Sequence, residues 1–267
     1  MTIISSFSSH GSPGVSVSSL ALALTWENPV LLIEADTTAP SSVMAGFMQA
    51  AIPYRRGISY LIESFHTYAP SLDSLWAQLI PLAQDPVSVS GGPYPKHLLA
   101  AAASPAAAAG YTSFWADLMS VCYEAEKAGV DTIIDLGRIT DKDPRLPILS
   151  ASTVTLAHLK STRVDISAAQ ENITRLGSYL ESSGKQDSYR LILHESLTGN
   201  YPAREVAATL NVPVAATLPY DPMQAAYYSY GIAPSGKHKS KYPAALRQYA
   251  TTVQHLAQQS RSILEEV

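Results

Sequence analysis

The chain has 267 residues, of which 46% are hydrophobic and 15% charged, and its formal net charge at pH 7 is −4. This balance supplies the apolar side chains of a sizeable core and excludes a globally disordered chain. The small negative charge gives no general attraction to nucleic acid or to an anionic membrane. The single cysteine, Cys122, excludes an intrachain disulfide, and a buried Cys122 in a reducing compartment is expected.

The beginning of the sequence lacks the basic residues that open a signal peptide. No apolar run reaches the length of a transmembrane helix. These features predict a cytoplasmic protein with no integral membrane segment. The length fits one large α/β domain or two small ones. Because no linker or internal repeat is visible, a single domain over residues 1–267 is the simpler prediction.

Strand and helix patterns alternate along the chain. Short apolar or β-branched runs predict strands at Thr2–Phe7, Val30–Asp36, Pro86–Pro93, Val130–Gly137, Ser152–His158, Tyr189–Ser196 and Val212–Pro219. Helical composition or periodicity predicts helices at Val17–Trp26, Ile58–Phe65, Leu72–Leu82, Lys96–Ala109, Tyr111–Ala128, Asp165–Glu181, Pro202–Leu210 and Pro243–Glu266. This alternation predicts an α/β fold, with a mostly parallel central sheet and helices on both faces.

Three polar features are expected to meet at the carboxyl edge of this sheet, where ligands of such folds bind. They are the Gly-containing loop Ser9–Ser16, the acidic end of "VLLIEAD" and Asp135 in "TIIDLG". Backbone N–H groups at a helix N-terminus bind phosphate. A hydroxyl on the first helical turn and a strand-end aspartate bind Mg²⁺, directly or through water. The set is typical of a nucleotide site.

Five segments in this order resemble the ParA/MinD group of deviant P-loop ATPases. They cover most of the chain and read "HGSPGVSVSSLALAL", "PVLLIEAD", "GVDTIIDLGRI", "LPILSASTVTLAHLKS" and "GNYPAREVAATLNVPVAATLPYDPMQAA". The loop is most similar to those of actinobacterial orphan ParA-like (TadZ-like) proteins. The resemblance implies a P-loop NTPase-like fold and a nucleotide site that pairs two subunits.

The family's loop reads lysine, two glycines, any residue, glycine, lysine and Ser/Thr. With Gly14 on the last glycine, His10 takes the place of the first lysine and Val15 that of the second. In the family the first lysine reaches the nucleotide of a partner subunit, and the second neutralises the β- and γ-phosphates. Both lysines are missing here, so the resemblance implies a degenerate Walker A loop.

The other loop residues complete a vestigial or weak nucleotide site. Gly11 and Ser12 fall on the glycine pair, Pro13 on the free position and Ser16 on the Mg²⁺-binding hydroxyl, followed by Val17. Pro13 removes one N–H donor from the loop. Backbone amides and the helix dipole survive, so weak anion binding is expected.

The resemblance also assigns residues outside the loop. Asp135 falls on the Walker B aspartate, and Glu34 and Asp36 on the acidic pair that positions water and metal. Ser16, Asp36 and Asp135 would therefore bind Mg²⁺ if a Mg-nucleotide binds. His194 stands where the family often has an asparagine near the base, and Pro219-Tyr220-Asp221 resembles the loop that borders the purine.

Each of these residues also has a purely structural explanation. Gly11 and Gly14 permit a tight strand–helix turn. Ser16 would cap its helix, and Asp135 would cap a helix or form a salt bridge. Arg138 would contact phosphate or pair with an acid, and the acid pair is favoured. Separately, Tyr227, Tyr228 and Tyr230 would form an interaction patch or pack normally, with packing favoured.

Removing one charged contact to a transition state commonly costs roughly 10²–10³ in rate. With both lysines gone, and a neutral histidine and an apolar valine in their places, we expect no useful ATP hydrolysis. The first hypothesis is a positioning or assembly scaffold that needs no cofactor and binds ATP or ADP with Mg²⁺ weakly at most. The resemblance implies protein partners in pilus or secretion-system assembly, or in DNA partitioning, and a possible homodimer.

Two alternatives stay open. One is an active ATP-dependent switch, in which Arg138, Arg55 or Arg56 replaces the lysine. It requires one of these arginines to lie near Ser16 and Asp135. The other is a non-specific DNA-binding module that uses the basic loop Lys237–Lys241, although a solvated loop is the simpler explanation.

Overall fold

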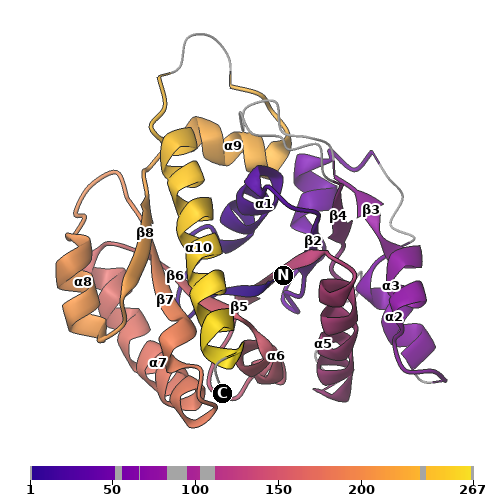
Figure 1. Ribbon diagram of the computed structural model, residues 1–267. Coiled ribbons are helices and arrows are strands. Elements are labelled where there is room, and N and C mark those ends of the chain that lie inside the picture. Colours follow the sequence, from indigo (N-terminus) through magenta and orange to yellow (C-terminus); the bar gives the residue numbers. More distant parts are fainter. Residues whose placement is uncertain are drawn as a thin grey trace.

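The computed structural model describes residues 2–51, 56–65, 67–82, 95–102, 112–234 and 239–265. Its eight strands form one sheet in the order β3-β4-β2-β5-β1-β6-β7-β8 (Figure 1). In chain order they are β1 Ile3–Ser8, β2 Val30–Glu34, β3 Ile80–Pro81, β4 Lys96–Leu99, β5 Asp131–Arg138, β6 Val154–Lys160, β7 Tyr189–His194 and β8 Val214–Leu218. Every neighbouring pair is parallel except β3–β4, which confirms the predicted α/β class.

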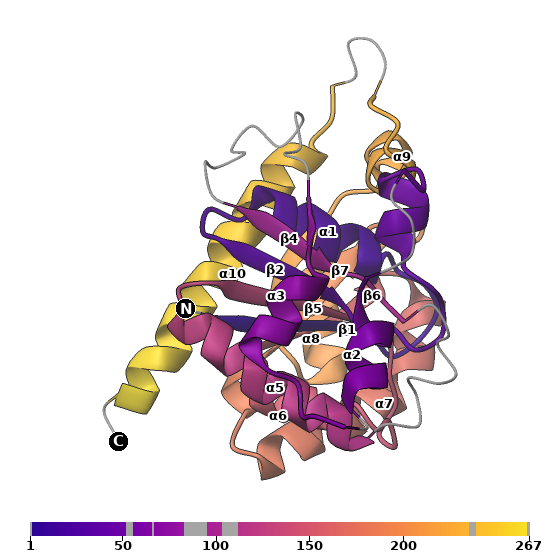
Figure 2. The ribbon, with the colours of Figure 1, turned by 90° about the vertical axis from the view of Figure 1, so that its right-hand side faces the viewer.

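Helices cover both faces of the sheet (Figure 2). Buried side chains of α1 (Val15–Thr25), the π-helix η1 (Val43–Phe47), α9 (Pro222–Tyr230) and α10 (Tyr242–Glu265) pack on one face. The opposite face is covered by α2 (Ile58–Phe65), α3 (Leu72–Gln78), α5 (Thr112–Lys127), α6 (Leu146–Ala151), α7 (Arg163–Ser182) and α8 (Ala203–Leu210). A short 3₁₀ turn, η2 (Gln186–Ser188), precedes β7. Among the described helices, none is long and apolar enough to cross a membrane.

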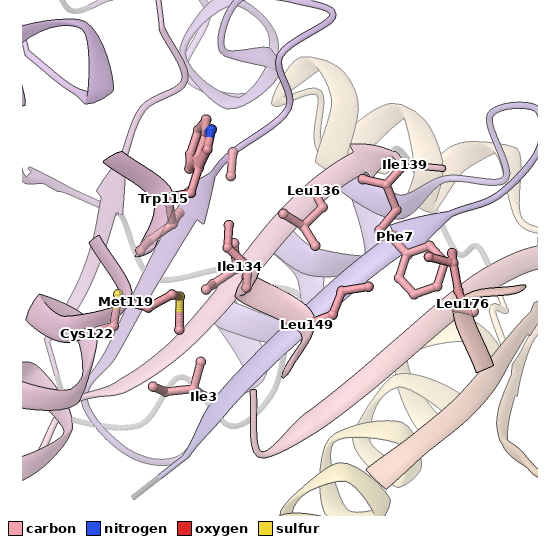
Figure 3. Close-up of a cluster of buried hydrophobic side chains, with 14 of the residues drawn as sticks. Ile3, Phe7, Trp115, Met119, Cys122, Ile134, Leu136, Ile139, Leu149 and Leu176 are labelled. Carbon is pink, nitrogen blue, oxygen red and sulfur yellow. The ribbon is translucent and has the colours of Figure 1, made fainter. Parts of the chain in front are cut away.

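The strands are apolar on both sides because both sides are covered. In β5, Ile134 belongs to the same cluster as Phe7 and Trp115, on the face that α5 covers (Figure 3). The adjacent Ile133 belongs to the cluster beneath α1 and α10. Cys122 of α5 is fully buried in the same α5-face cluster, and burial raises the pKa of its thiol to about 12. The predicted role of this cysteine as a small core residue is confirmed.

Helix α1 is buried on nearly all sides. Nine of its residues are buried, including Ser18 and Ser19 as well as its leucines and alanines. A helix that is covered all round belongs to the interior of the fold, and α1 contacts β1, β5, α9 and α10. The loop that leads into α1 therefore rests on a rigidly enclosed helix.

The register of the central strands decides which loops meet. Ser6 of β1 pairs with Asp135 of β5, and Glu34 of β2 pairs with the same aspartate. Since these strands are parallel, the segments that follow them emerge at one edge of the sheet. The loop after β1, Asp36 and the end of β5 are thus neighbours.

The helix predicted at Lys96–Ala109 is wrong over its described residues, because Lys96–Leu99 forms β4 and residues 100–102 are not helical. Val30 of β2 pairs with Lys96, and Leu98 and Leu99 are buried on opposite faces. The alanines that suggested a helix follow the strand, and residues 103–110 lie outside the described part of the chain. Pairing with β2 here overrides local helix propensity.

Other differences concern the edges of elements and short segments. The helix predicted at Leu72–Leu82 ends at Gln78, because Ile80–Pro81 forms β3 beside β4. The short elements η1, α6 and α9 were not predicted. The strand predicted at Pro86–Pro93 lies outside the described residues, as do Arg55 and Lys237.

Helix α9 packs directly on η1 with no room for larger side chains. A Cβ at Gly46 would lie 2.0 Å from the carbonyl oxygen of Ser229, and one at Gly231 would lie 2.3 Å from that of Phe47. Tyr227 and Tyr228 are buried, which confirms packing as their role, while Tyr230 is 61% exposed.

The packing of β5 predicts a large effect of truncation in the core. Ile134→Ala should lower the free energy of unfolding by about 2–5 kcal/mol, because the substitution leaves a cavity in a closed cluster. Val164 is 75% exposed, so Val164→Ala should change it by no more than about 0.5 kcal/mol. Urea denaturation followed by circular dichroism measures both. Equal effects would show that Ile134 is not in the core.

Candidate functional site at the loop after the first strand

The loop between β1 and α1 depends on two glycines. Gly11 has φ +64° and Gly14 has φ +106°, both in the left-handed region that disfavours other residues. Gly14 is the N-cap of α1, and a Cβ there would lie 3.7 Å from the ring of His194. The structural explanation of these glycines is therefore correct, and it is compatible with a binding role.

The N-terminus of α1 faces a cavity of about 330 Å³. The first bond within the helix runs from Ser18 N–H to the Gly14 carbonyl at 2.9 Å. The N–H groups of Val15, Ser16 and Val17 consequently have no acceptor inside the helix. Donors of this kind, together with the helix dipole, favour an anion.

Ser16, which lines this cavity, interacts with the buried Asp135. Asp135 is 2% exposed and accepts hydrogen bonds from the Ser16 hydroxyl and, at 2.8 Å, from Gly137 N–H. Burial raises the pKa of Asp135 from 3.8 to about 7, and the nearby carboxylates of Glu34 and Asp36 add to the increase. Gly14, not Ser16, caps the helix, so the prediction of Ser16 as a cap is wrong.

Asp36 lies on the rim of the same cavity. Its carboxylate accepts hydrogen bonds from the Thr38 N–H at 2.8 Å and the Thr38 hydroxyl at 2.7 Å. It also packs on Gly137, where a Cβ would lie 2.2 Å from a carboxylate oxygen. Ser16 and Asp36 thus line one cavity, with the buried Asp135 bonded to Ser16, and the oxygens of all three are of the kind that Mg²⁺ prefers.

Metal binding by these side chains would need further ligands. Within the described ranges, no group of three or more His, Cys, Asp or Glu side chains is arranged to bind a metal ion. Mg²⁺ keeps several waters and commonly takes oxygens from a substrate phosphate. The residues present fit a Mg-nucleotide better than a free metal ion.

Glu34 does not belong to this group, although the sequence placed it in an acidic pair with Asp36. Its carboxylate accepts hydrogen bonds from the hydroxyls of Ser41 and Ser42 and from Val43 N–H. It therefore holds the start of η1. Burial raises the pKa of Glu34.

Arg138 follows Asp135 and also lines the cavity. Its guanidinium donates to the Gly11 carbonyl at 3.2 Å, across the mouth of the loop. The ion pairs among the described residues do not include Arg138, so the favoured prediction of an acid pair is wrong. Arg56, another predicted substitute for the lysine, instead donates to the Leu79 carbonyl at 3.3 Å.

A second cavity, of about 250 Å³, lies on the other side of the loop. Ser12, Gly14 and Val17 line both cavities, and Pro13 lines this one. The second cavity is completed by residues from the ends of β6, β7 and β8 and from α9, among them Lys160, His194, Glu195, Pro219, Tyr220 and Asp221. The structure therefore brings together the residues predicted to border a base. Lys160 was not predicted because its position at the end of β6 carries no sequence signal.

His194 is paired with a buried histidine. Its Nε2 lies 3.0 Å from His158 Nδ1. Burial lowers the pKa of His194 to about 4, and burial lowers that of His158 as well. Both rings are consequently neutral at pH 7, and neither belongs to a metal cluster among the described side chains.

The two positions that correspond to the family's lysines differ in their surroundings. Val15 lines the first cavity and is only 5% exposed, so it presents an apolar side chain to the space in front of α1. His10 is exposed, and neither cavity includes it. The site therefore combines backbone donors, carboxylates and Arg138 with an apolar residue at the first position of α1.

No family model and no curated protein matches the sequence. Solved structures do match the fold. A ParA family ATPase from Chlorobium tepidum has TM-score 0.69 and 13% identity, over 94% of this chain and 98% of that chain. MinD complexed with Mg-ADP from Pyrococcus horikoshii has TM-score 0.67 and 15% identity, over 97% and 98%. MinD in a MinC:MinD cell division complex from Aquifex aeolicus has TM-score 0.67 and 13% identity, over 96% of each chain.

These similarities establish that the protein has the fold of the ParA/MinD P-loop ATPases. The alignments span nearly the whole of each chain, and the sheet order and flanking helices agree with that class. At 13–15% identity the similarity concerns the fold. The properties of this site follow from its own residues.

The raised pKa of Asp135 predicts a pH-dependent effect of Asp135→Asn. Because the folded protein binds the proton more tightly than the unfolded chain, ionisation of Asp135 destabilises the fold increasingly from pH 3.8 to about 7. The asparagine variant should therefore be more stable than the wild type by ~2–4 kcal/mol at pH 8, and by less at pH 5.

Thermal and urea denaturation at several pH values measure this difference. Asp187→Asn serves as the control because Asp187 is exposed. If the gain in stability of Asp135→Asn does not change with pH, ionisation of Asp135 is not its cause.

Proposed function

We propose that this protein is a ParA/MinD-like positioning or assembly protein that does not hydrolyse ATP. The observation that carries the proposal is Val15, an apolar residue at the first position of α1, which lines the same cavity as Ser16 and Asp36. Phosphoryl transfer depends on positioning and on charge stabilisation. A valine supplies neither a donor nor a charge.

Nucleotide binding does not require the charge that hydrolysis needs. The free N–H groups of α1 and the Ser16–Asp135 pair support weak binding of ATP or ADP with Mg²⁺. Ser16 and Asp36 would face the metal and Asp135 would orient Ser16. The cavity with His194 and Tyr220 would accommodate the base. Bound Mg²⁺ would supply charge neutralisation of the phosphates.

The protein would act through contacts with other proteins. MinD of Aquifex aeolicus was solved in complex with MinC, and the same fold here offers a comparable platform. The proposed partners are pilus or secretion-system components or a partitioning apparatus in the cytoplasm. A homodimer through the face that carries the loop is part of this proposal, and it would not depend on a lysine.

Introducing a lysine at position 15 should increase the affinity of the site for nucleotide. Val15→Lys places an ammonium group at the mouth of α1, so Mg-ATP should bind at least about tenfold more tightly, the equivalent of ~1.4 kcal/mol. Val15→Met is the matched control, because it has similar length without charge. Isothermal titration calorimetry with ATP and ADP, with and without Mg²⁺, measures the affinities.

Phosphate release by the wild type is measured in parallel and should equal the background without enzyme. Turnover by the wild type would overturn the scaffold proposal. Equal affinities of Val15→Lys and Val15→Met would show that the missing lysine does not limit the site.

A second candidate function is an ATP-dependent switch in which Arg138 supplies the charge. The position of Arg138 favours it, because its side chain lines the same cavity as Ser16 and bonds to the loop at Gly11. A guanidinium binds phosphate oxygens in a bidentate manner. If the Arg138 guanidinium broke its hydrogen bond to the Gly11 carbonyl, its N–H donors would become available to a terminal phosphate.

Substitution of Arg138 tests this candidate. Arg138→Ala should weaken Mg-ATP binding by about tenfold or more, and Arg138→Lys should weaken it less. Arg56→Ala is the control, since Arg56 bonds to the Leu79 carbonyl and does not line the cavity. Equal affinities in all variants would exclude the switch, and calorimetry measures them.

A further inference from the structure

Arg145 is a buried cation close to the candidate site. It lies in the segment between β5 and α6, and it is 1% exposed, among the largest fully buried side chains of the described residues. Arginine is almost never fully buried unless its charge is paired and its donors are bonded. Its bonding partners therefore indicate what it does.

Three of those partners are backbone carbonyls at the ends of two strands. The Nη1 atom donates to the Ala35 carbonyl at 2.8 Å and to the Leu136 carbonyl at 2.6 Å. The Nη2 atom donates to the Arg138 carbonyl at 2.9 Å. One guanidinium thus connects the segment after β2, 110 residues before Arg145 in the sequence, to the end of β5.

The fourth partner, Asp143, fixes the direction of the guanidinium. Its carboxylate accepts from Nε at 2.8 Å and from Nη2 at 2.6 Å, and it also accepts from the Arg145 N–H at 2.9 Å. This ion pair is largely buried, since the Asp143 side chain is 13% exposed. A bidentate pair of this kind restricts the arginine to one orientation.

Each carbonyl belongs to a residue that matters to the cavity or lies next to one. Ala35 precedes Asp36, Leu136 follows Asp135, and Arg138 is the cation at the cavity rim. The ladder between β2 and β5 ends with Ala35 N–H donating to the Asp135 carbonyl at 2.7 Å. Beyond that point, Arg145 supplies the donors that connect the two diverging segments.

We propose that Arg145 is a positioning residue that sets the separation of Asp36, Asp135 and Arg138 around the cavity. Only the planar guanidinium group of arginine can donate hydrogen bonds to three carbonyls and a carboxylate at once. A lysine at this position would satisfy part of the set, and an apolar residue would leave the carbonyls and Asp143 unpaired. The importance of this cavity for function rests on the proposed nucleotide binding, but the geometric role of Arg145 does not depend on it.

Amide hydrogen exchange measured by NMR on the nucleotide-free protein tests this role. The Gly137 N–H is the reporter, because it donates directly to Asp135. The β7 amides, around Ile192, are the reference, because that strand is buried and does not contact Arg145. The variant is Arg145→Lys, and Arg175→Lys is the matched control. Arg175 is an exposed arginine that pairs with Asp141 in the segment that also carries Asp143.

In Arg145→Lys, exchange at Gly137 should be faster by about tenfold to a hundredfold, whereas the β7 amides should change much less. Arg175→Lys should leave Gly137 unchanged. Equal acceleration at Gly137 and in β7 would mean that Arg145 contributes to global stability only, and it would overturn the proposal. Unchanged exchange at Gly137 would overturn it as well.

If Arg145→Lys does not fold, Asp143→Asn replaces it. That variant keeps the arginine and loosens its orientation, so it should accelerate exchange at Gly137 in the same direction and to a smaller extent. No effect of Asp143→Asn on Gly137 would also overturn the proposal. Nucleotide calorimetry on the wild type decides the proposed function independently, because no nucleotide enters the exchange experiment.

Discussion

The pairing of β5 with both β1 and β2 is the constraint on which the site depends. Because Asp135 is in register with Ser6 on one side and Glu34 on the other, three chain segments leave the sheet at one place. Each strand places particular side chains in each of the two core clusters, as β5 does with Ile133 and Ile134, so a shift by one residue would disrupt the packing of both. The loop, the acidic residues and the arginines acquire their proximity from this pairing.

The electrostatic consequence is an unbalanced group of acids. Asp135 and Glu34 are buried with raised pKa values, and Asp36 stands beside them. A lysine at position 15 would offset part of this charge. With valine in its place, the cavity retains one cationic side chain, Arg138, beside Asp36.

The fold could be predicted from the sequence because strands buried in a parallel sheet are continuous apolar runs. "VLLIEAD" and "VDTIIDLG" are apolar runs that end in acids, and both are central strands. It failed at Lys96–Leu99, where alanines after the strand dominated the pattern. It gave no warning of Arg145, because an arginine in a polar segment has the pattern of a surface residue, and only the convergence of three distant carbonyls makes it an interior one.

The contact between η1 and α9 has a mechanical consequence. Gly46 and Gly231 bring the two backbones so close that neither element can shift without displacing the other. The carboxylate of Glu34, two residues before Asp36, accepts a hydrogen bond from Val43 N–H at the start of η1. Tyr230, the last residue of α9, is exposed, so a displacement of η1 would have to be accommodated by α9 and by the surface around this ring. The close contact of η1 and α9 thus connects the segment after β2 to an exposed aromatic side chain on the opposite side of that contact.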